Sequence, residues 1–356
     1  MSSQGANQGG MDQEREKGSG RTLRRRALSA PTLIAFVLAG AFLAFLFTRF
    51  DIDLEEVGRN LSESNPLLYG SAMAIYYLSF VARGFRWRVM MKNVEAQRGG
   101  EHPVPGLMAC SSYILLGWFA NSITIFRLGE AYRTYLVSEA TGASFSRTAG
   151  TILTERALDL FLVFGLLGAA VLFAAATGEI GSFAKFLLIA FGLMAAAGLI
   201  LLFMRQFGLR LAGRFPVRIQ ETYQRFHQGA LLSLKQLPLV SALGLAAWAC
   251  EVARLYFVVQ ALGFTLPFSM IVFVSMTHSV LTAIPITPGG LGLSGPGMVG
   301  LLMLRLSQTQ AVAVALLDRT ITYLSIVVFG GLFFIVREAR RQLKGSTPVA
   351  NPEARL

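Results

Sequence analysis

Eight long apolar stretches constrain what this chain can fold into more than any other feature of its sequence. They lie at about residues 31–50, 66–83, 106–126, 149–176, 183–204, 238–263, 267–284 and 310–336. A helix of about 20 mostly apolar residues crosses a bilayer, whereas a lone strand cannot satisfy its backbone in lipid. Only 15% of the residues are charged, against about 25% in a soluble domain. The sequence therefore predicts an all-α polytopic transmembrane helical bundle.

Polar, basic stretches flank the apolar region at both ends. The first 30 residues are rich in Gly and Ser and end in a run of arginines, and the C-terminal stretch is basic again. We therefore expect a disordered basic cytoplasmic tail over 1–30, a transmembrane domain over 31–336 and a cytoplasmic tail over 337–356. A cleaved signal peptide is the alternative for the N-terminus, but no small-x-small cleavage site follows residue 47.

The distribution of basic residues predicts the topology. Loop 51–65 is acidic, whereas 205–237 and the C-terminal tail are basic. If every apolar segment crossed once, 205–237 would lie outside. We therefore expect six full spans and two opposed re-entrant hairpins, at 106–147 from the cytoplasm and at 267–306 from outside, with both termini cytoplasmic. Eight or nine plain spans is the alternative.

Two basic stretches act as cytoplasmic markers in this arrangement. The first follows the segment 66–83 and contains Arg83, Arg86, Arg88, Lys92 and Arg98. The second, 205–237, carries six Lys or Arg residues against the single acidic residue Glu221. We expect it to be either an amphipathic helix lying on anionic lipid or an ordinary connecting loop.

The net charge of +12 does not indicate a nucleic-acid partner, because the basic residues flank apolar segments in the way typical of membrane proteins. Cys110 and Cys250 lie in apolar stretches and are expected to be buried free thiols.

Ionisable residues inside apolar segments are the candidate functional residues, because each is costly in lipid unless it is paired. Arg127, Glu130 and Arg133 are spaced three apart, so a helix places them on one face. Arginine binds phosphate through two parallel hydrogen bonds. This spacing predicts a clamp for a lipid phosphate, with Glu130 orienting the arginines or meeting a cationic headgroup. A purely structural ion cluster at a hairpin tip is the alternative.

A second group, Glu155, Arg156 and Asp159, opens the long apolar helix at 149–176. Glu155 and Asp159 are four apart and therefore share one face. Arg156 points elsewhere, within reach of the first group. An anchor at the membrane edge is the alternative role.

Two more groups lie in later segments. Glu251 and Arg254 are three apart, which favours an internal ion pair. Asp318 and Arg319 are adjacent and cannot face each other on a helix, so each is expected to have a partner on another segment. Tyr323 follows Arg319 by four residues.

A Pro/Gly-rich break interrupts the second expected hairpin, over Pro285-Ile-Thr-Pro288-Gly289-Gly290-Leu-Gly292. Irregular backbone at membrane depth is tolerated only against protein or a water-filled cavity. We expect Ser294 to cap the half-helix that follows and Pro296 to occupy its first turn. The N-terminus of that half-helix would then bind an anion, with a simple kink as the alternative. The expected site residues here are Gly289, Gly290, Gly292 and Ser294.

Two motif matches in this region are misleading. Gly290-Leu-Gly292-Leu-Ser-Gly295 fits the dinucleotide-binding fingerprint as a string, but no strand is expected before it. Gly292-Leu-Ser294-Gly295 resembles an intramembrane serine protease motif, which needs a later His, whereas His278 precedes it. No Cys/His cluster has metal-ligand spacing. We therefore expect no catalytic residue, no cofactor and no metal.

These motifs together resemble the lysylphosphatidylglycerol synthase transmembrane region, or flippase-like, family, over roughly residues 30–340. That family typically shows R-x-G-E-x-x-R, G-x-S-x-x-x-A, E-R-x-x-D and P-x-x-P-G-G-x-G in this order. The matching stretches begin at Arg127, Gly142, Glu155 and Pro285, and the Asp318-Arg319 and Tyr323 pattern also fits. The family often has an acidic residue shortly after the glycine turn, where this chain has Ser294-Gly295-Pro296. This departure predicts a different lipid.

The resemblance implies a lipid translocase of a prokaryotic cell (inner or plasma) membrane, not an enzyme. It would move a phospholipid or a polyprenyl-phosphate-linked lipid between leaflets. Arg127 and Arg133 would hold the phosphate, opposite the half-helix at Gly290–Ser294. The remaining cavity and ion-pair residues are Glu155, Arg156, Asp159, Glu251, Arg254, Asp318, Arg319 and Tyr323.

Membrane lipid is thus the expected partner, and envelope biosynthesis enzymes are candidate partners. Two alternatives stay open: a membrane transferase acting on a lipid-linked substrate, and a non-transporting scaffold of an envelope-lipid biosynthesis complex. The short C-terminal tail leaves no room for a soluble aminoacyl transferase domain, so synthesis of aminoacyl-phosphatidylglycerol is not expected.

Overall fold

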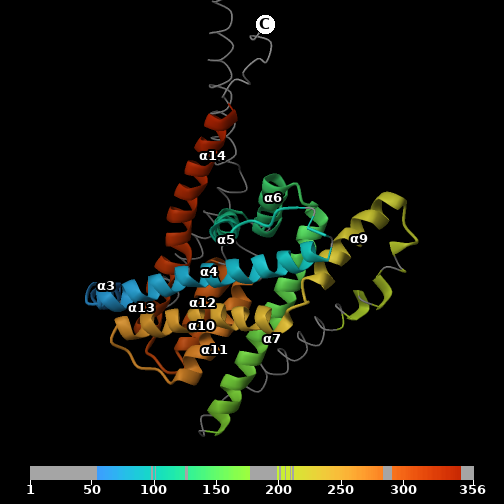
Figure 1. Ribbon diagram of the computed structural model, residues 1–356. Helices are drawn as coiled ribbons and strands as arrows, with labels where there is room; N and C mark the ends of the chain where they lie inside the picture. Colours follow the sequence, from blue (N-terminus) through green and yellow to red (C-terminus); the bar gives the residue numbers. More distant parts are fainter. Residues whose placement is uncertain are drawn as a thin grey trace, which may run out of the picture.

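The computed structural model describes residues 54–97, 99–100, 102–124, 127–176, 199, 202–204, 206–208, 210, 212–283 and 291–345, to which all structural statements below refer. Among these residues the elements are helices and no strand occurs (Figure 1). Their bounds are α3 Leu54–Ser62, α4 Pro66–Ala96, α5 Leu107–Ile123, α6 Gly129–Thr141, α7 Phe145–Ala176, α9 Val217–Leu232, α10 Leu237–Ala261, α11 Phe268–Ala283, α12 Leu291–Leu302, α13 Gln308–Arg319, the π-helices η2 Thr320–Leu324 and η3 Ile326–Gly330, and α14 Gly331–Gly345. The predicted all-α class is confirmed for this part of the chain.

Three helices within the described ranges are long and apolar enough to cross a membrane. They are Phe145–Phe173, Leu237–Ala261 and Gln308–Arg341, and each coincides with a predicted span. Two shorter apolar helices, Leu107–Ile123 and Phe268–Thr282, coincide with the first arms of the two predicted hairpins. The number of full spans and the side of each terminus stay predictions. The predicted tail 1–30, the segment 31–50, most of 183–204 and the break at 285–290 lie outside the described residues.

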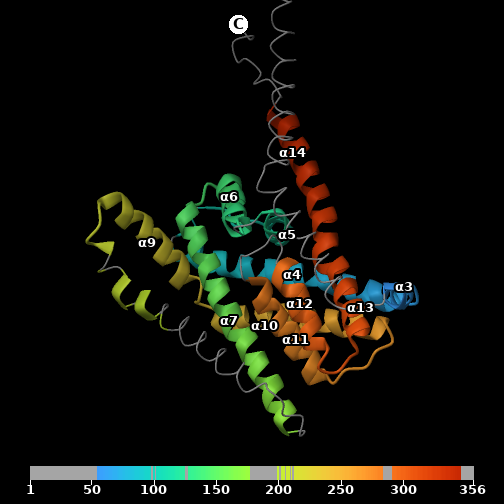
Figure 2. The same cartoon turned by 180° about the vertical axis from the view of Figure 1, so that it is seen from behind.

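Helices α4 and α10 form the centre of the molecule, side by side and running in opposite directions (Figures 1 and 2). Helix α7 crosses them, and α9 packs along α7. In Figures 1 and 2 the α5–α6 pair lies above this centre and α11 lies below it, while α12 overlaps the centre in both views. The apolar core draws its side chains from all of these layers except α9, which packs mainly on α7.

Helix α4 continues well beyond the apolar segment predicted at 66–83. Asn65 caps its start by accepting hydrogen bonds from two backbone N–H groups of the first turn (3.0 and 3.3 Å), and Pro66 follows at the first position. The helix then runs through Arg83 and Arg86, which are only 2% and 0% exposed. These two arginines are therefore buried in the protein and are not exposed charges that follow a span, while the side of the membrane on which α4 ends stays a prediction.

The first predicted hairpin, 106–147, is present as two packed helices, α5 and α6. The helices approach so closely that a Cβ added at Gly129 would lie 1.9 Å from the carbonyl oxygen of Gly117. Asn121 fixes the start of α6, because its Oδ1 accepts a hydrogen bond from Gly129 N at 2.8 Å. Small residues at such a crossing are typical of helix packing in membranes. The re-entrant path of this hairpin stays a prediction.

The second predicted hairpin contains α11 and α12, which pack against each other. Helix α12 begins at Leu291, so Ser294 and Pro296 both lie within it. The predictions that Ser294 caps this helix and that Pro296 occupies its first turn are therefore wrong. Pro296 has no N–H for the intrahelical hydrogen bond and sits in the helix interior. Ser294 is fully buried and uses its hydroxyl in a tertiary contact instead.

The last span is one continuous helix assembled from α13, η2, η3 and α14. A capping box starts it: Ser307 Oγ accepts from Gln310 N at 3.3 Å, and Gln310 Oε1 accepts from Ser307 N at 3.1 Å. The two π-helical stretches follow directly after Arg319, and such stretches are frequent at functional sites. Because α14 continues to Gly345, the tail predicted at 337–356 begins as a helix.

Residues 217–232 of the basic 205–237 segment form helix α9, so this part is not an irregular connecting loop. It is a helix, and it packs on α7 so closely that a Cβ added at Gly229 would lie 1.9 Å from the carbonyl oxygen of Arg147. His227 is also buried, with Nε2 3.1 Å from Met204 O. Contact of the opposite face with lipid stays a prediction.

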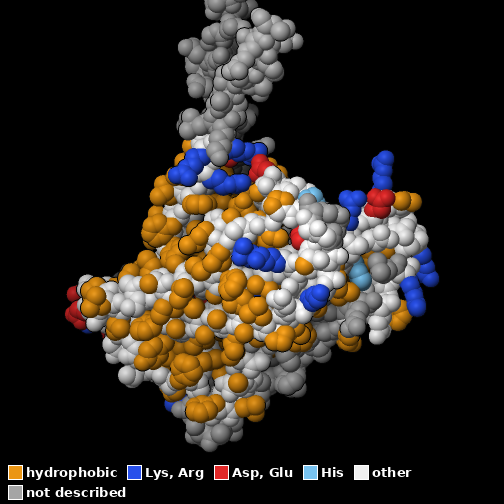
Figure 3. Space-filling model, viewed as in Figure 1, with side chains coloured by type: hydrophobic (Ala, Val, Ile, Leu, Met, Phe, Trp, Pro, Cys, Tyr) orange, Lys and Arg blue, Asp and Glu red, His pale blue; other side chains and the backbone are white. Residues whose placement is uncertain are grey.

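The outer surface is rich in large hydrophobic side chains. Leu67, Met108 and Leu172 are 80%, 74% and 68% exposed. Figure 3 shows hydrophobic side chains over most of the face formed by α4 and α10, with Lys and Arg gathered where α14 ends and around α9. A soluble monomer rarely exposes a contiguous apolar patch of more than a few hundred Å². This surface therefore fits a lipid environment.

Candidate functional site

Four charged side chains meet in the interior where α4, α6 and α7 converge, and we call them the buried cluster: Arg86, Arg133, Glu155 and Asp159. Arg86 donates from Nη1 to Asp159 Oδ1 at 2.6 Å and from Nη2 to Glu155 Oε1 at 3.0 Å. Arg133 donates from Nη2 to Glu155 Oε2. All four side chains are buried. Glu155 and Asp159 thus share one face, as predicted, and that face binds Arg86.

Aromatic rings complete the surroundings of this cluster. The Arg133 guanidinium lies over the Trp87 ring, 4.6 Å from its centroid, and Trp87 Nε1 donates to Thr151 Oγ1 at 3.0 Å. Trp248 Nε1 donates to Asp159 Oδ1 at 3.2 Å. Arg133 is therefore committed to an interior ion pair and an aromatic stack. The structure does not place it on the accessible side of the hairpin, where a phosphate clamp with Arg127 would require it.

The accessible charges at the hairpin tip are Arg127, Glu130 and Arg156, which we call the tip group. Glu130 Oε1 lies 3.0 Å from Arg156 Nη2 and 3.7 Å from Arg127 Nη2. Their side chains are 30%, 25% and 35% exposed for Arg127, Glu130 and Arg156, respectively. Arg156 therefore does reach the first group, as predicted, and it takes the place expected for Arg133. Asn121 Nδ2 also donates to Glu130 Oε2, at 3.3 Å.

Arg127 joins the two hairpins. It has a left-handed backbone with φ of 48°, which is unusual for a side chain of this size. Its Nη1 donates to the backbone oxygen of Thr282, near the end of α11, at 2.5 Å. The tip of the first hairpin therefore lies against the helix that enters the predicted Pro/Gly break.

A second set of buried charges links α4, α10 and α13, and we call it the core chain: Arg83, Glu251, Arg254 and Asp318. Arg83 Nη2 donates to Glu251 Oε1 at 3.0 Å, and Arg254 Nε donates to Glu251 Oε2 at 3.3 Å. Arg254 also pairs with Asp318. The predicted Glu251–Arg254 pair is present, and each member has a further partner on another helix.

Arg319 has a different environment from its neighbour Asp318. Its Nη2 lies 3.0 Å from His278 Nε2 on α11, and it donates to the Ser294 hydroxyl on α12. Tyr323, one turn on, donates from its hydroxyl to Ser122 O on α5 at 3.4 Å. The prediction that Asp318 and Arg319 find partners on other segments is confirmed. Gly289 and Gly290 lie outside the described residues, and Gly292 lies in the first turn of α12.

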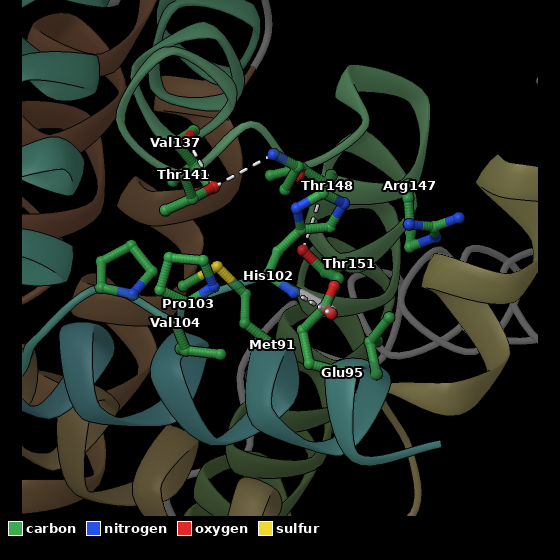
Figure 4. Close-up of a pocket in the computed structure, with 13 residues that line it drawn as sticks. Met91, Glu95, His102, Pro103, Val104, Val137, Thr141, Arg147, Thr148 and Thr151 are labelled. Atoms are coloured by element: carbon green, nitrogen blue, oxygen red, sulfur yellow. Dashed lines mark hydrogen bonds between the residues drawn. The ribbon is translucent and has the colours of Figure 1, made fainter. Parts of the chain in front are cut away.

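A small pocket opens beside these charges, between the end of α4, the segment 102–105, α6 and α7 (Figure 4). At the edge of this pocket, Glu95 Oε2 accepts a hydrogen bond from His102 N at 3.3 Å. The hydroxyls of Thr141, Thr148 and Thr151 lie along the opposite side. Because Thr151 also accepts from Trp87, this pocket adjoins the aromatic support of Arg133.

Several residues of the site were not identified from the sequence. Arg83 and Arg86 are the main ones. They are three residues apart and next to Trp87, and this spacing could have indicated that both lie on one face of a helix. The chain has three tryptophans, and each contacts a buried charge: Trp87 stacks on Arg133, while Trp118 and Trp248 lie 5.3 and 5.0 Å from the guanidinium carbon of Arg83. In the described ranges no three His, Cys, Asp or Glu side chains gather as metal ligands.

The fold and these charges define a class: a multi-pass helical membrane protein whose charged side chains pair inside the protein. Comparison with protein families gives the particular family. The family described as the lysylphosphatidylglycerol synthase TM region matches residues 32–330, and the chain belongs to it.

Similar proteins include several that are described only as membrane proteins. A UPF0104 membrane protein of Methanocaldococcus jannaschii is 32% identical over 228 residues, which cover 62% of this chain and 94% of that protein. Another UPF0104 membrane protein, of Methanothermobacter thermautotrophicus, is 21% identical over 84% of this chain and 91% of its own length. The glycosyltransferase AglD of Haloferax volcanii is 28% identical over 47% of this chain, which covers 25% of AglD.

Proposed function

We propose that this protein is a lipid translocase of the cell membrane, which moves a phospholipid or a polyprenyl-phosphate-linked lipid between leaflets. The observation that carries the proposal is the tip group. Two partly exposed arginines flank one carboxylate, and one of them, Arg127, also contacts α11 of the second hairpin. Guanidinium groups bind phosphate through paired hydrogen bonds, and exposed intramembrane charges mark substrate pathways.

In this proposal Arg127 and Arg156 bind the lipid phosphate, while the acyl or isoprenoid chains stay in the bilayer. Glu130 holds the two arginines apart and in place, because it pairs with both. Arg133 serves as a support, since it is paired with Glu155 in the interior. The buried cluster and the core chain then fix the helices around the site. The protein performs no covalent chemistry in this scheme.

The test is transport in liposomes. Purified protein is reconstituted with tail-labelled lipids that are anionic, zwitterionic or isoprenoid, and the inner-leaflet label is followed as it becomes accessible to an external quencher. We expect transport above protein-free liposomes for at least one lipid class. Arg127→Gln and Arg156→Gln are expected to lower the rate at least about tenfold, which corresponds to about 1.4 kcal/mol. Rates equal to those of protein-free liposomes for all lipids would refute the proposal.

The matched control is Arg225→Gln on α9. Arg225 also pairs with a glutamate, Glu221, at 3.6 Å, but its side chain is 53% exposed. It lies on α9, which belongs to neither hairpin. This variant is expected to transport lipid at the wild-type rate. Loss of transport in Arg225→Gln, or wild-type transport in both tip-group variants, would show that the tip group is not the headgroup site.

A membrane transferase acting on a lipid-linked sugar is a second candidate. Its support is the match to the glycosyltransferase AglD, although this chain covers only 25% of that protein. An assay in detergent distinguishes the two functions, because lipid cannot be moved between leaflets where no bilayer exists. Transfer of a sugar to a lipid acceptor by the solubilised protein would favour the transferase, and transport without any such transfer favours the translocase.

A further inference from the structure

The charges around the two hairpins do not balance. The buried cluster has two arginines and two carboxylates, and so does the core chain. The tip group has two arginines, Arg127 and Arg156, against the single carboxylate of Glu130. Arg156 also lies 3.6 Å from Asp159 Oδ2, but that carboxylate is already counted in the buried cluster. Arg319 has no carboxylate within ion-pair distance among the described residues. By count, positive charge therefore exceeds negative charge by one in the tip group and by one at Arg319, among the residues that the structure describes.

The partners of Arg319 carry no negative charge. An arginine only donates hydrogen bonds, so His278 Nε2 must accept from it at 3.0 Å, and the ring is then neutral with its proton on Nδ1. The Ser294 hydroxyl is also neutral. Arg319 is partly buried, and its two partners His278 and Ser294 are 5% and 0% exposed. Even a partly buried charge without a counter-charge is costly inside a membrane protein, and a bound anion would lower that cost.

The two excess charges lie along one face of α11. Arg127 contacts the backbone of Thr282, and Arg319 contacts the ring of His278. Positions 278 and 282 are four apart, so they are neighbours on the helix surface, separated by about one turn, or about 5.4 Å along the axis. One compact anionic headgroup can therefore lie between the two arginines.

From this charge balance we infer that the substrate headgroup carries close to two negative charges: it is a lipid phosphomonoester or diphosphate, not a phosphodiester. This inference rests on the proposed function, because it uses the same site. A phosphomonoester carries about −1.5 to −2 at pH 7. A phosphodiester lipid carries one negative charge and would leave one arginine uncompensated. A headgroup with an additional amine would be repelled by both excess arginines.

The test compares lipids that differ only in the headgroup. Phosphatidic acid, phosphatidylglycerol and phosphatidylcholine with identical acyl chains are assayed for binding by native mass spectrometry and for transport in liposomes. We expect phosphatidic acid to bind at least about tenfold more tightly than phosphatidylglycerol, a difference of about 1.4 kcal/mol. Equal binding of the two overturns the inference. If phosphatidylglycerol is transported and binds as tightly as phosphatidic acid, the headgroup inference is overturned but the proposed translocase function is not.

A preference for phosphatidic acid without transport of any lipid has the opposite meaning. It supports the headgroup inference and refutes translocation. Inorganic phosphate is added alone as a competitor, to separate a lipid site from a site for the free anion. Displacement of phosphatidic acid by micromolar phosphate would overturn the inference, and no displacement at that concentration supports it.

Substitution of Arg319 gives an independent measurement. Arg319→Gln removes an uncompensated cation, so the lipid-free protein is expected to unfold at the same or a higher temperature than wild type. The variant should lose most of the tenfold preference for phosphatidic acid, whereas Arg225→Gln should keep it. A clear loss of thermal stability, with the lipid preference intact, would show that Arg319 is only a structural residue and would overturn the inference.

Discussion

Arg86 on α4 and Asp159 on α7 face each other through two parallel hydrogen bonds, of 2.6 Å from Nη1 to Oδ1 and 3.2 Å from Nη2 to Oδ2. Arg86 is 0% and Asp159 5% exposed, so this fork-shaped pair is out of reach of solvent. Only arginine has the planar group that makes such a two-bond contact. The pair therefore acts as a fixed link between the two helices.

The first prediction concerns this link. Arg86→Leu is expected to lower the free energy of unfolding by about 3–5 kcal/mol, because it leaves Asp159 and Glu155 buried with fewer partners. Arg86→Lys keeps the charge but not the two-bond geometry and should fall between Arg86→Leu and wild type. Thermal unfolding in detergent measures both. Arg225→Gln is the control and should change stability by no more than about 0.5 kcal/mol. An Arg86→Leu protein as stable as this control would contradict the role of the pair.

The second prediction concerns the crossing of α5 and α6. Gly129→Ala is expected to destabilise the hairpin, because its Cβ would lie 1.9 Å from Gly117 O and the backbone would have to move. Gly165→Ala on α7 is the matched control, since nothing lies within 4 Å of a Cβ there. That substitution should be neutral or stabilising by up to about 1 kcal/mol, from helix propensity alone. If both glycines tolerate alanine equally in thermal unfolding, the close crossing is not present in the protein.

The third prediction separates the backbone of Arg127 from its charge. With φ of 48°, a residue with a Cβ is strained at this position, and glycine is not. Arg127→Gly and Arg127→Ala remove the same guanidinium, so both should lose transport. The glycine variant should nevertheless be more stable than the alanine variant by about 1 kcal/mol. Equal stability of the two variants would show that the left-handed turn is absent.

Much of this site followed from spacing along single helices. Helical neighbours three or four residues apart lie on one face, which is why the Glu251–Arg254 pair and the shared face of Glu155 and Asp159 were predictable. The adjacent pair Asp318-Arg319 was equally informative, since two neighbours on a helix cannot pair with each other and must find partners elsewhere.

The contacts between helices were not predictable in the same way. Arg86 and Asp159 are 73 positions apart, and nothing local specifies that α4 and α7 meet there. Arg83 and Arg86 were taken for cytoplasmic markers, because the positive-inside rule counts charges near the end of an apolar segment and does not register that the helix continues. Ser294 was misplaced for a related reason: helix α12 starts before it, and propensity rules fix helix ends only to within a few residues.

The final prediction uses His278 to supply the charge that Arg319 lacks. His278→Gln retains an acceptor oxygen for the guanidinium and should preserve stability and transport. His278→Lys places a second cation where Nε2 lies 3.0 Å from Arg319, so it should lower stability by at least about 2 kcal/mol and reduce lipid binding. His278→Glu provides the missing carboxylate. This variant should raise the unfolding temperature of the lipid-free protein, because the new carboxylate neutralises Arg319. For the same reason it should weaken the preference for phosphatidic acid over phosphatidylglycerol. If His278→Glu and His278→Lys behave alike in both measurements, the electrostatic account of Arg319 is wrong.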